Sequence, residues 1–282
     1  MPLSSFDRFG QMPPASPVVL SVPHAGRDYP LPLRAAAAVP TEAMRPLEDR
    51  HVDAVAIAAR RHETLFVQQR ARAWIDLNRA EEERDPLIDE GARPIATGAI
   101  SAKLRSGLGL VPRRAAPGVA IWCRRLGDDE VARRIVEDHR PYHAALGEAL
   151  AAARTRFGAA LLIDLHSMPR LPGATAAQIV LGDRFGQSAV ARLSHRLETA
   201  ARAAGLRVAM NAPYSGGFVL ARHARPRDDI HAIQIEVDRS LYLDAALDRP
   251  GPGLAQTAAI LRAMIDAAVD DLLDGSLMNA AE

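Results

Sequence analysis

Short apolar runs, most of them bounded by proline, glycine or a polar group, constrain the fold of this chain more than any other feature. The first is Pro-Val-Val-Leu-Ser-Val at residues 17–22. Similar runs occupy residues 64–68, 73–77, 160–165, 178–181, 206–210 and 232–237. Runs of this length with little polar alternation are typical of strands that are buried on both faces of a sheet.

Segments with helical periodicity separate these runs. Apolar side chains recur at helical spacing in residues 42–61, 128–156, 188–204 and 254–273. Strands that alternate with helices predict an α/β fold with a mixed, mostly parallel sheet covered on both faces. We expect a single domain over residues 1–282, with an irregular excursion at about 80–125, where Arg, Gly and Pro are frequent and no period persists.

Composition excludes several classes of function. The net charge of +1 provides no long-range field that would attract nucleic acid or an anionic membrane. Cys123 is the only cysteine, so neither an internal disulfide nor a Cys-rich metal site is possible. Lys103 is the only lysine and Leu104 follows it, which excludes a Walker A loop. With no leader pattern or membrane-length apolar run, we expect a cytoplasmic protein that acts on a small molecule, in an oligomeric state that the sequence does not indicate.

Polar side chains lie at the ends of several predicted strands. They are His24, the group Asp76, Asn78 and Arg79, His166, and Glu236. Ligands of open α/β sheets collect beyond the carboxyl ends of the strands. We therefore expect these side chains to meet in one crevice.

Two of these residues are candidate metal ligands. His24 and His166 each follow an apolar run directly, and a catalytic zinc site commonly combines two histidines, one carboxylate and an open position for water. We favour Asp49 as the carboxylate, with Glu48 and Asp53 as alternatives, because all three lie around the start of the next predicted helix.

Asp164 is expected to support the second of these histidines. It precedes His166 by two residues and would share its face in a strand, so it could orient the imidazole from behind or cap a neighbouring amide instead.

The remaining histidines favour structural roles. His139 and His143 are spaced as a helical metal clamp, but Pro141 and the surrounding residues favour a surface or helix-packing role. We interpret the others as solvated or locally capping: His51, His62, His195 and His231.

Four residues suggest how an acidic substrate could be bound and attacked. The guanidinium of Arg79 can grip a carboxylate with two hydrogen bonds, and Asn78 beside it offers a donor and an acceptor. Arg222, which follows the Gly216-Gly217 turn, is a weaker candidate for the same task. Glu236 lies in an otherwise apolar strand, where desolvation would raise its pKa toward that of a general base; an ion pair with Arg239 is the alternative.

Five motifs in order resemble the N-formylglutamate amidohydrolase family. They are Ser21-Val22-Pro23-His24-Ala25-Gly26, Asp76-Leu77-Asn78-Arg79, Ile163-Asp164-Leu165-His166-Ser167, Gly216-Gly217-Phe218, and Gln234 to Tyr242. That family looks related to the zinc carboxypeptidases and to the aspartoacylase and succinylglutamate desuccinylase group. The resemblance implies a phosphorylase/hydrolase-like three-layer α/β sandwich with one zinc ion per chain.

The resemblance also implies roles for individual residues. His24 and His166 become zinc ligands, Glu236 the base that removes a proton from the zinc-activated water, and Asn78 and Arg79 the contacts to the substrate carboxylate. Zinc carboxypeptidases carry a glutamate three residues after their first histidine, whereas Arg27 stands there in this chain, so Asp49 remains an inference.

These observations together favour hydrolysis of the N-acyl amide of an acidic amino acid. N-formyl-L-glutamate, cleaved to formate and L-glutamate in histidine degradation, is the leading substrate. One alternative is a deacylase or carboxypeptidase that acts on a larger acyl group. The other is a catalytically inactive zinc-binding module, which the presence of Glu236 beside two histidines disfavours.

Overall fold

The computed structural model describes residues 5–93 and 102–279, which belong to two compact units of the chain. Unit 1 is made of Met1–Asp7, Pro23–Asp49 and Gln68–Ala144, and unit 2 of Arg8–Val22, Arg50–Val67 and Ala145–Glu282. The expectation of one domain over residues 1–282 stays a prediction. Part of the expected excursion, residues 94–101, lies outside the described residues.

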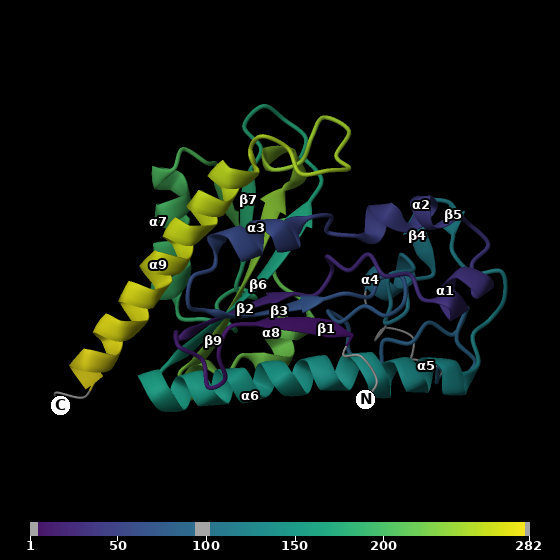
Figure 1. Cartoon of the computed structure of the whole chain (residues 1–282), viewed down its shortest axis with the longest axis horizontal. Helices are drawn as coiled ribbons and strands as arrows, with labels where there is room; N and C mark the ends of the chain where they lie inside the picture. Colours follow the sequence, from purple (N-terminus) through teal and green to yellow (C-terminus); the bar gives the residue numbers. More distant parts are fainter. Residues whose placement is uncertain (1–4, 94–101, 280–282) are drawn as a thin grey trace. The chain divides into compact units, whose positions relative to one another are not determined.

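A seven-stranded sheet forms the centre of unit 2 (Figure 1). Its strands, in spatial order, are β1 (Phe6–Phe9), β3 (Thr64–Gln68), β2 (Val18–Val22), β6 (Ala160–Met168), β9 (Ile230–Asp238), β7 (Ile179–Gly182) and β8 (Val208–Met210). β2 pairs in parallel with β3 and β6, β6 with β9, and β7 with β8, whereas β7 and β9 are antiparallel. The prediction of a mixed, mostly parallel sheet is confirmed.

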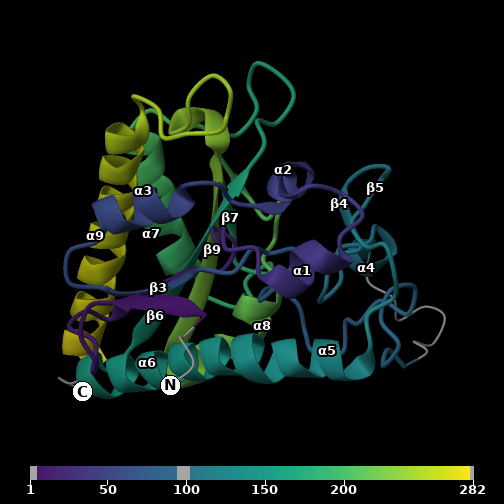
Figure 2. The ribbon, with the colours of Figure 1, turned by 45° about the vertical axis from the view of Figure 1, so that its right-hand side comes forward.

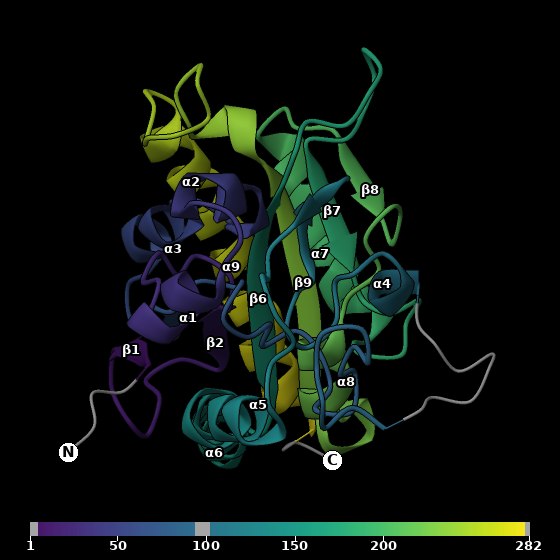
Figure 3. The same ribbon diagram turned by 90° about the vertical axis from the view of Figure 1, so that its right-hand side faces the viewer.

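The central strands are buried along their whole length, as the continuous apolar runs predicted. β6 and β9 each extend over nine residues, longer than the runs that indicated them. Figure 3 shows β6, β9, β7 and β8 side by side in this order. Because β6 and β9 are long, His166 and Glu236 lie within the strands and are paired neighbours in the sheet.

Helices flank the sheet of unit 2. α3 (Val52–Ala59) and α7 (Ala191–Ala203) pack on either side of α9 (Leu254–Asn279). α8 (Phe218–His223) packs against β6 and β9, and it lies with the later part of α6 (Arg140–Phe157) on the other side of the sheet (Figure 2). Within the described residues, no helix is both long and apolar enough to cross a membrane.

Unit 1 consists mainly of loops and short elements. These are α1 (Leu31–Ala36), α2 (Thr41–Met44), the 3₁₀ turn η1 (Arg45–Leu47), α4 (Ala102–Arg105), and the antiparallel pair β4 (Arg114–Ala116) and β5 (Val119–Ala120). α5 (Asp128–Arg134) continues through a π-helical turn, η2 (Ile135–His139), into the first residues of α6. Two further 3₁₀ turns, η3 (Pro226–Asp228) and η4 (Arg239–Leu241), belong to unit 2.

Two predicted elements were wrong. Residues 73–77 form turns instead of a strand. Ile75 and Leu77 are apolar because the loop is buried, and the backbone of Asp76 bonds to Leu110 of another loop. The helix predicted over 42–61 is divided into α2, η1 and α3. Pro46 has no backbone N–H with which to continue α2, Glu48 is extended after η1, and His51 takes a left-handed backbone conformation with φ of 57°.

Candidate metal centre

His24 lies in unit 1, two residues after β2, and is buried. Its Nε2 is 2.7 Å from Asp76 Oδ1, and its Nδ1 is 3.5 Å from Asp49 Oδ2. The backbone N–H of Asp49 also donates to the carbonyl of His24 at 2.9 Å. The backbone bond therefore keeps His24 and Asp49 together and brings Nδ1 near the carboxylate, although 25 positions separate the two residues in the sequence (49 − 24 = 25).

Asp76 anchors this part of the site. Its Oδ1 also accepts from the backbone N–H of Asn78 at 2.8 Å, and its Oδ2 accepts from Arg72 Nε and Nη2, each at 2.8 Å. Burial alone would raise the pKa of Asp76, but the charges of Arg72 and Arg79 and the hydrogen bond from His24 outweigh it and hold the pKa well below its usual range. An ionised carboxylate only accepts, so His24 Nε2 carries the hydrogen and Nδ1 is the nitrogen suited to a metal.

His166 is supported in the same way within unit 2. Its Nε2 is 2.8 Å from Asp164 Oδ2, and Asp164 Oδ1 accepts from the hydroxyl of Ser21 at 2.7 Å. All three residues are buried. The Asp164 side chain thus contacts the His166 imidazole, as the spacing in the sequence predicted. That Asp164 orients His166 as a metal ligand stays a prediction.

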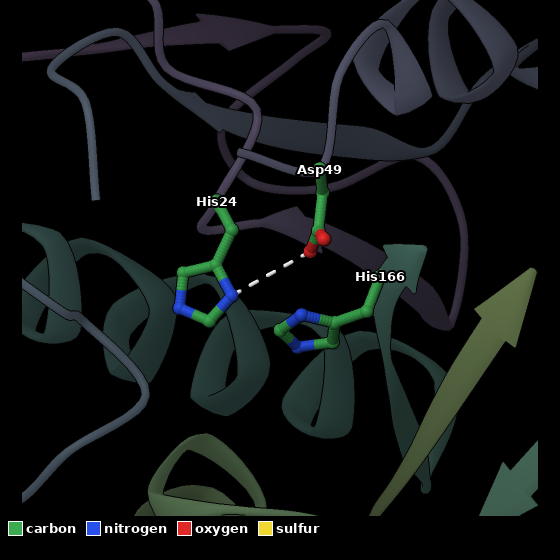
Figure 4. A group of neighbouring side chains, drawn as sticks. All are labelled: His24, Asp49 and His166. Atoms are coloured by element: carbon green, nitrogen blue, oxygen red, sulfur yellow. Dashed lines mark ion pairs between the residues drawn. The ribbon is translucent and has the colours of Figure 1, made fainter. Parts of the chain in front are cut away.

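His24, Asp49 and His166 form one buried group (Figure 4). Each offers one ligand atom, and these atoms all lie within 4.8 Å of one another. Two imidazoles and a carboxylate are the donor set of a catalytic zinc site, and a carboxylate on the second nitrogen of each ring is the usual support for such ligands. The group could therefore bind a metal ion.

The two alternative carboxylates are placed differently. Glu48 is buried and accepts a hydrogen bond from the hydroxyl of Tyr29. Asp53 lies in the first turn of α3 and is half-buried. The group that could hold a metal includes Asp49 and neither of these two residues.

Glu236 lies on β9, where it is the register partner of His166 on β6. It is buried, and its Oε1 accepts from Gln234 Nε2 at 2.9 Å. Arg239, the alternative ion-pair partner, donates through Nε to Ser167 Oγ at 3.0 Å. The backbone of β9 and the Gln234 amide together orient the Glu236 carboxylate.

Asn78 and Arg79 are buried in the turn that replaces the predicted strand end in unit 1. Arg79 donates through Nη1 to the carbonyl of Asn78 at 2.6 Å and through Nε to that of Leu108 at 2.8 Å. Its Nη2 makes no hydrogen bond with the part of the chain that the structure describes. Glu81, two positions after Arg79, pairs with Arg140 at 2.8 Å.

The structure separates the remaining predicted residues by their exposure. Arg222 is exposed in the last turn of α8, and a substrate role for it stays a prediction. Of the two roles expected for His139 and His143, the surface role was wrong and the packing role agrees with the structure: both residues are buried, and their Nε2 atoms bond to the carbonyls of Arg79 and Leu77 at 2.8 and 2.9 Å. His231 is buried rather than solvated, and that burial lowers its pKa.

Sequence reasoning missed three supporting side chains. Gln234 stands two positions before Glu236, just as Asp164 stands before His166, so the alternation of a strand was a usable signal. Asp76 was noticed in its motif, but its partner His24 lies 52 positions away. Ser21 reaches Asp164 only because β2 and β6 pair in that register, which the sequence does not specify.

Comparison with known proteins gives one consistent family. The family model of N-formylglutamate amidohydrolase matches residues 16–243. An N-formylglutamate deformylase of Pseudomonas putida is 31% identical over 239 residues, 81% of this chain and 82% of that protein. One of Pseudomonas aeruginosa is 30% identical over 208 residues, 72% of each chain. A solved structure, an N-formylglutamate amidohydrolase from Ralstonia eutropha JMP134, aligns with a TM-score of 0.88 at 34% identity, covering 97% of this chain and 100% of its own.

Proposed function

Because the chain belongs to the N-formylglutamate amidohydrolase family, we propose that it hydrolyses N-formyl-L-glutamate to formate and L-glutamate. The observation that carries this proposal is the buried group of His24, Asp49 and His166, the donor set that such a hydrolysis needs. The names of the relatives supply the substrate, and histidine breakdown is the pathway that this substrate implies.

We assign the metal as one Zn²⁺ per chain, held by His24, Asp49 and His166. Two nitrogen donors and one carboxylate oxygen suit zinc better than Mg²⁺ or Ca²⁺, which prefer oxygen ligands alone. When bound, zinc would supply Lewis acidity toward the formyl oxygen and lower the pKa of a water molecule. Asp76 and Asp164 orient the two imidazoles and increase their basicity.

Glu236 is the proposed general base. The hydrogen bond from Gln234 occupies Oε1 and orients the carboxylate. Glu236 takes a proton from the attacking water, whose oxygen bonds to the formyl carbon. As the carbon–nitrogen bond breaks, the same proton passes from Glu236 to the nitrogen and the amine of glutamate is released. The formic acid formed with it loses the remaining water proton to give formate.

Arg79 and Asn78 are proposed to hold a carboxylate of the substrate. Two nitrogens of the Arg79 guanidinium are fixed on backbone carbonyls, so the direction of the third, Nη2, is defined before a ligand binds. A fixed guanidinium selects a carboxylate over an amide by charge and by geometry. Arg222 remains the second candidate for this contact.

A substrate screen tests the proposal. The N-formyl, N-formimino, N-acetyl and N-succinyl derivatives of L-glutamate, and N-formyl-L-glutamine as the neutral control, are incubated with enzyme with and without added zinc. We expect formate release from N-formyl-L-glutamate, stimulated by zinc, and little turnover of the glutamine derivative. A preference for a longer acyl group would identify a different deacylase, and no turnover of any substrate in the presence of zinc would contradict an enzymatic role.

A further inference from the structure

We propose that His139 and His143 are positioning residues, which hold the backbone of Leu77 to Arg79 and thereby aim the Arg79 guanidinium at the substrate carboxylate. This inference rests on the substrate role of Arg79 proposed above. All the residues concerned belong to unit 1.

The two histidines bond to the carbonyls on either side of Asn78. His143 Nε2 is 2.9 Å from the oxygen of Leu77, and His139 Nε2 is 2.8 Å from the oxygen of Arg79. A carbonyl oxygen only accepts, so both rings carry a hydrogen on Nε2. Among the described residues no strand pairs with this turn, and the imidazoles provide the hydrogen bonds that a β-ladder would have provided.

The helix that carries the histidines is adapted to this task. In a regular helix, successive residues are offset by about 100°, so residues 134 and 138 share one face and residues 139 and 143 share the neighbouring face. The π-helical turn at Ile135–His139 inserts one extra residue into this stretch. His139 and His143 bond to the same loop as Arg134 and Asp138.

Arg134 and Asp138 fix the beginning of the same loop. Arg134 Nη1 donates to the carbonyl of Trp74 at 3.0 Å, and its guanidinium lies 3.8 Å from the centre of the Trp74 ring. The indole N–H of Trp74 donates to Asp138 Oδ2 at 2.6 Å. One continuous helix therefore holds the loop at both ends, and the histidines hold the end that carries Arg79.

The position of the Arg79 backbone decides the direction of its side chain. Nη1 and Nε of Arg79 donate to the carbonyls of Asn78 and Leu108, which are close enough only while the turn keeps its shape. Without the His139 bond, the carbonyl of Arg79 would have to find another donor, and the turn would shift. The guanidinium would then sample several directions and bind the substrate carboxylate more weakly.

The experiment compares variants that keep or remove the donor at Nε2. Gln retains an N–H at about the reach of His Nε2, Asn is too short, and Phe removes the donor while preserving the ring. Steady-state kinetics with N-formyl-L-glutamate are measured on the zinc-loaded His139→Gln, His139→Asn and His139→Phe enzymes and on the same three variants of His143. His231→Phe, which alters a buried histidine in unit 2, is the matched control.

We expect KM to rise about tenfold in the Phe and Asn variants with kcat mostly kept, as for a lost ground-state contact, and to recover in the Gln variants. A histidine that only stabilises the fold would lower kcat by reducing the active fraction and would leave KM unchanged. Should the Phe variants fail to fold, the comparison of Gln with Asn decides the question.

The outcomes separate this inference from the proposed function. An inactive wild-type enzyme would overturn the proposed function and this inference with it. An active wild type whose Phe and Asn variants keep the normal KM would overturn the positioning role alone. The result would also contradict this role if His231→Phe raised KM as much as the variants of His139 and His143.

Discussion

His24 and His166 are supported by the same kind of contact, but the local structures that create it differ. His166 and Asp164 stand two positions apart on β6, so the strand itself brings their side chains to one face. His24 and Asp76 come from two loops of unit 1, 52 positions apart, and meet only after both loops have folded. A carboxylate–histidine contact within one strand can therefore be predicted from the sequence, whereas a contact between two loops cannot.

The supporting carboxylates of Asp164 and Asp76 also differ in the groups that donate hydrogen bonds to them. Asp164 accepts from His166 and Ser21. Asp76 accepts from His24, from the backbone of Asn78 and from the guanidinium of Arg72. The loop-built support therefore connects the candidate metal ligand His24 to the turn that carries Asn78, whereas the strand-built support serves mainly its own histidine.

The strongest test of the comparison asks whether both histidines hold the same ion. We expect His24→Ala and His166→Ala each to reduce the metal content from one ion per chain to almost none, because two remaining ligands bind zinc weakly. Elemental analysis of the purified variants measures this. Full occupancy in either variant would exclude that residue from the site, and normal occupancy in Asp49→Ala would transfer the ligand role to Glu48 or Asp53.

The next effect concerns Glu236, which the same strand register places beside His166. We expect Glu236→Gln to retain its metal while kcat falls roughly 10²-fold, the scale of a lost general base. Steady-state kinetics and metal analysis of the same preparation check both parts. A kcat near that of the wild type would leave Glu236 with a structural role only.

Replacing the two supporting carboxylates compares the two regions directly. We expect Asp76→Asn and Asp164→Asn each to weaken zinc binding roughly 10- to 100-fold, as measured by competition with a chelator. Asp76→Asn should also lower the thermal stability of the protein more than Asp164→Asn does, because it removes the buried carboxylate that pairs with the Arg72 guanidinium. Equal losses of stability in the two variants would contradict the wider role that we assign to Asp76.

The smallest expected effect is a pH dependence that does not involve either histidine. Burial alone would raise the pKa of Glu63, but hydrogen bonds from Arg262 and from the backbone of Arg61 outweigh it and lower the pKa below 4.5. A lowered pKa in the folded state means that this contribution to stability is present above pH 4.5 and is lost as the pH falls through the folded-state value.

Glu63→Gln should therefore reduce the difference in unfolding free energy between neutral and acidic solution. Denaturant unfolding at a series of pH values measures that difference. The two curves should separate most at neutral pH and approach each other in acid. Curves that stay equally separated at every pH would show that the Glu63 carboxylate is protonated to the same extent in both states.

The strand-borne half of the candidate site could be predicted from local sequence. Apolar runs at 160–165 and 232–237 indicated β6 and β9, and the two-residue alternation paired Asp164 with His166. The same alternation pairs Gln234 with Glu236. These relations follow from the backbone geometry of a strand, which does not depend on the rest of the molecule.

The loop-borne half was decided by tertiary structure. Residues 73–77 are as apolar as a strand, yet they lead into a turn in which the carbonyls of Leu77 and Arg79 bond to His143 and His139, on a helix some 60 positions away. An apolar composition indicates that a segment is buried, but it does not distinguish a buried loop from a buried strand. What distinguishes them is the source of the backbone hydrogen-bond partners, and in this chain two histidines of a distant helix supply them, one from its π-helical turn and one from α6.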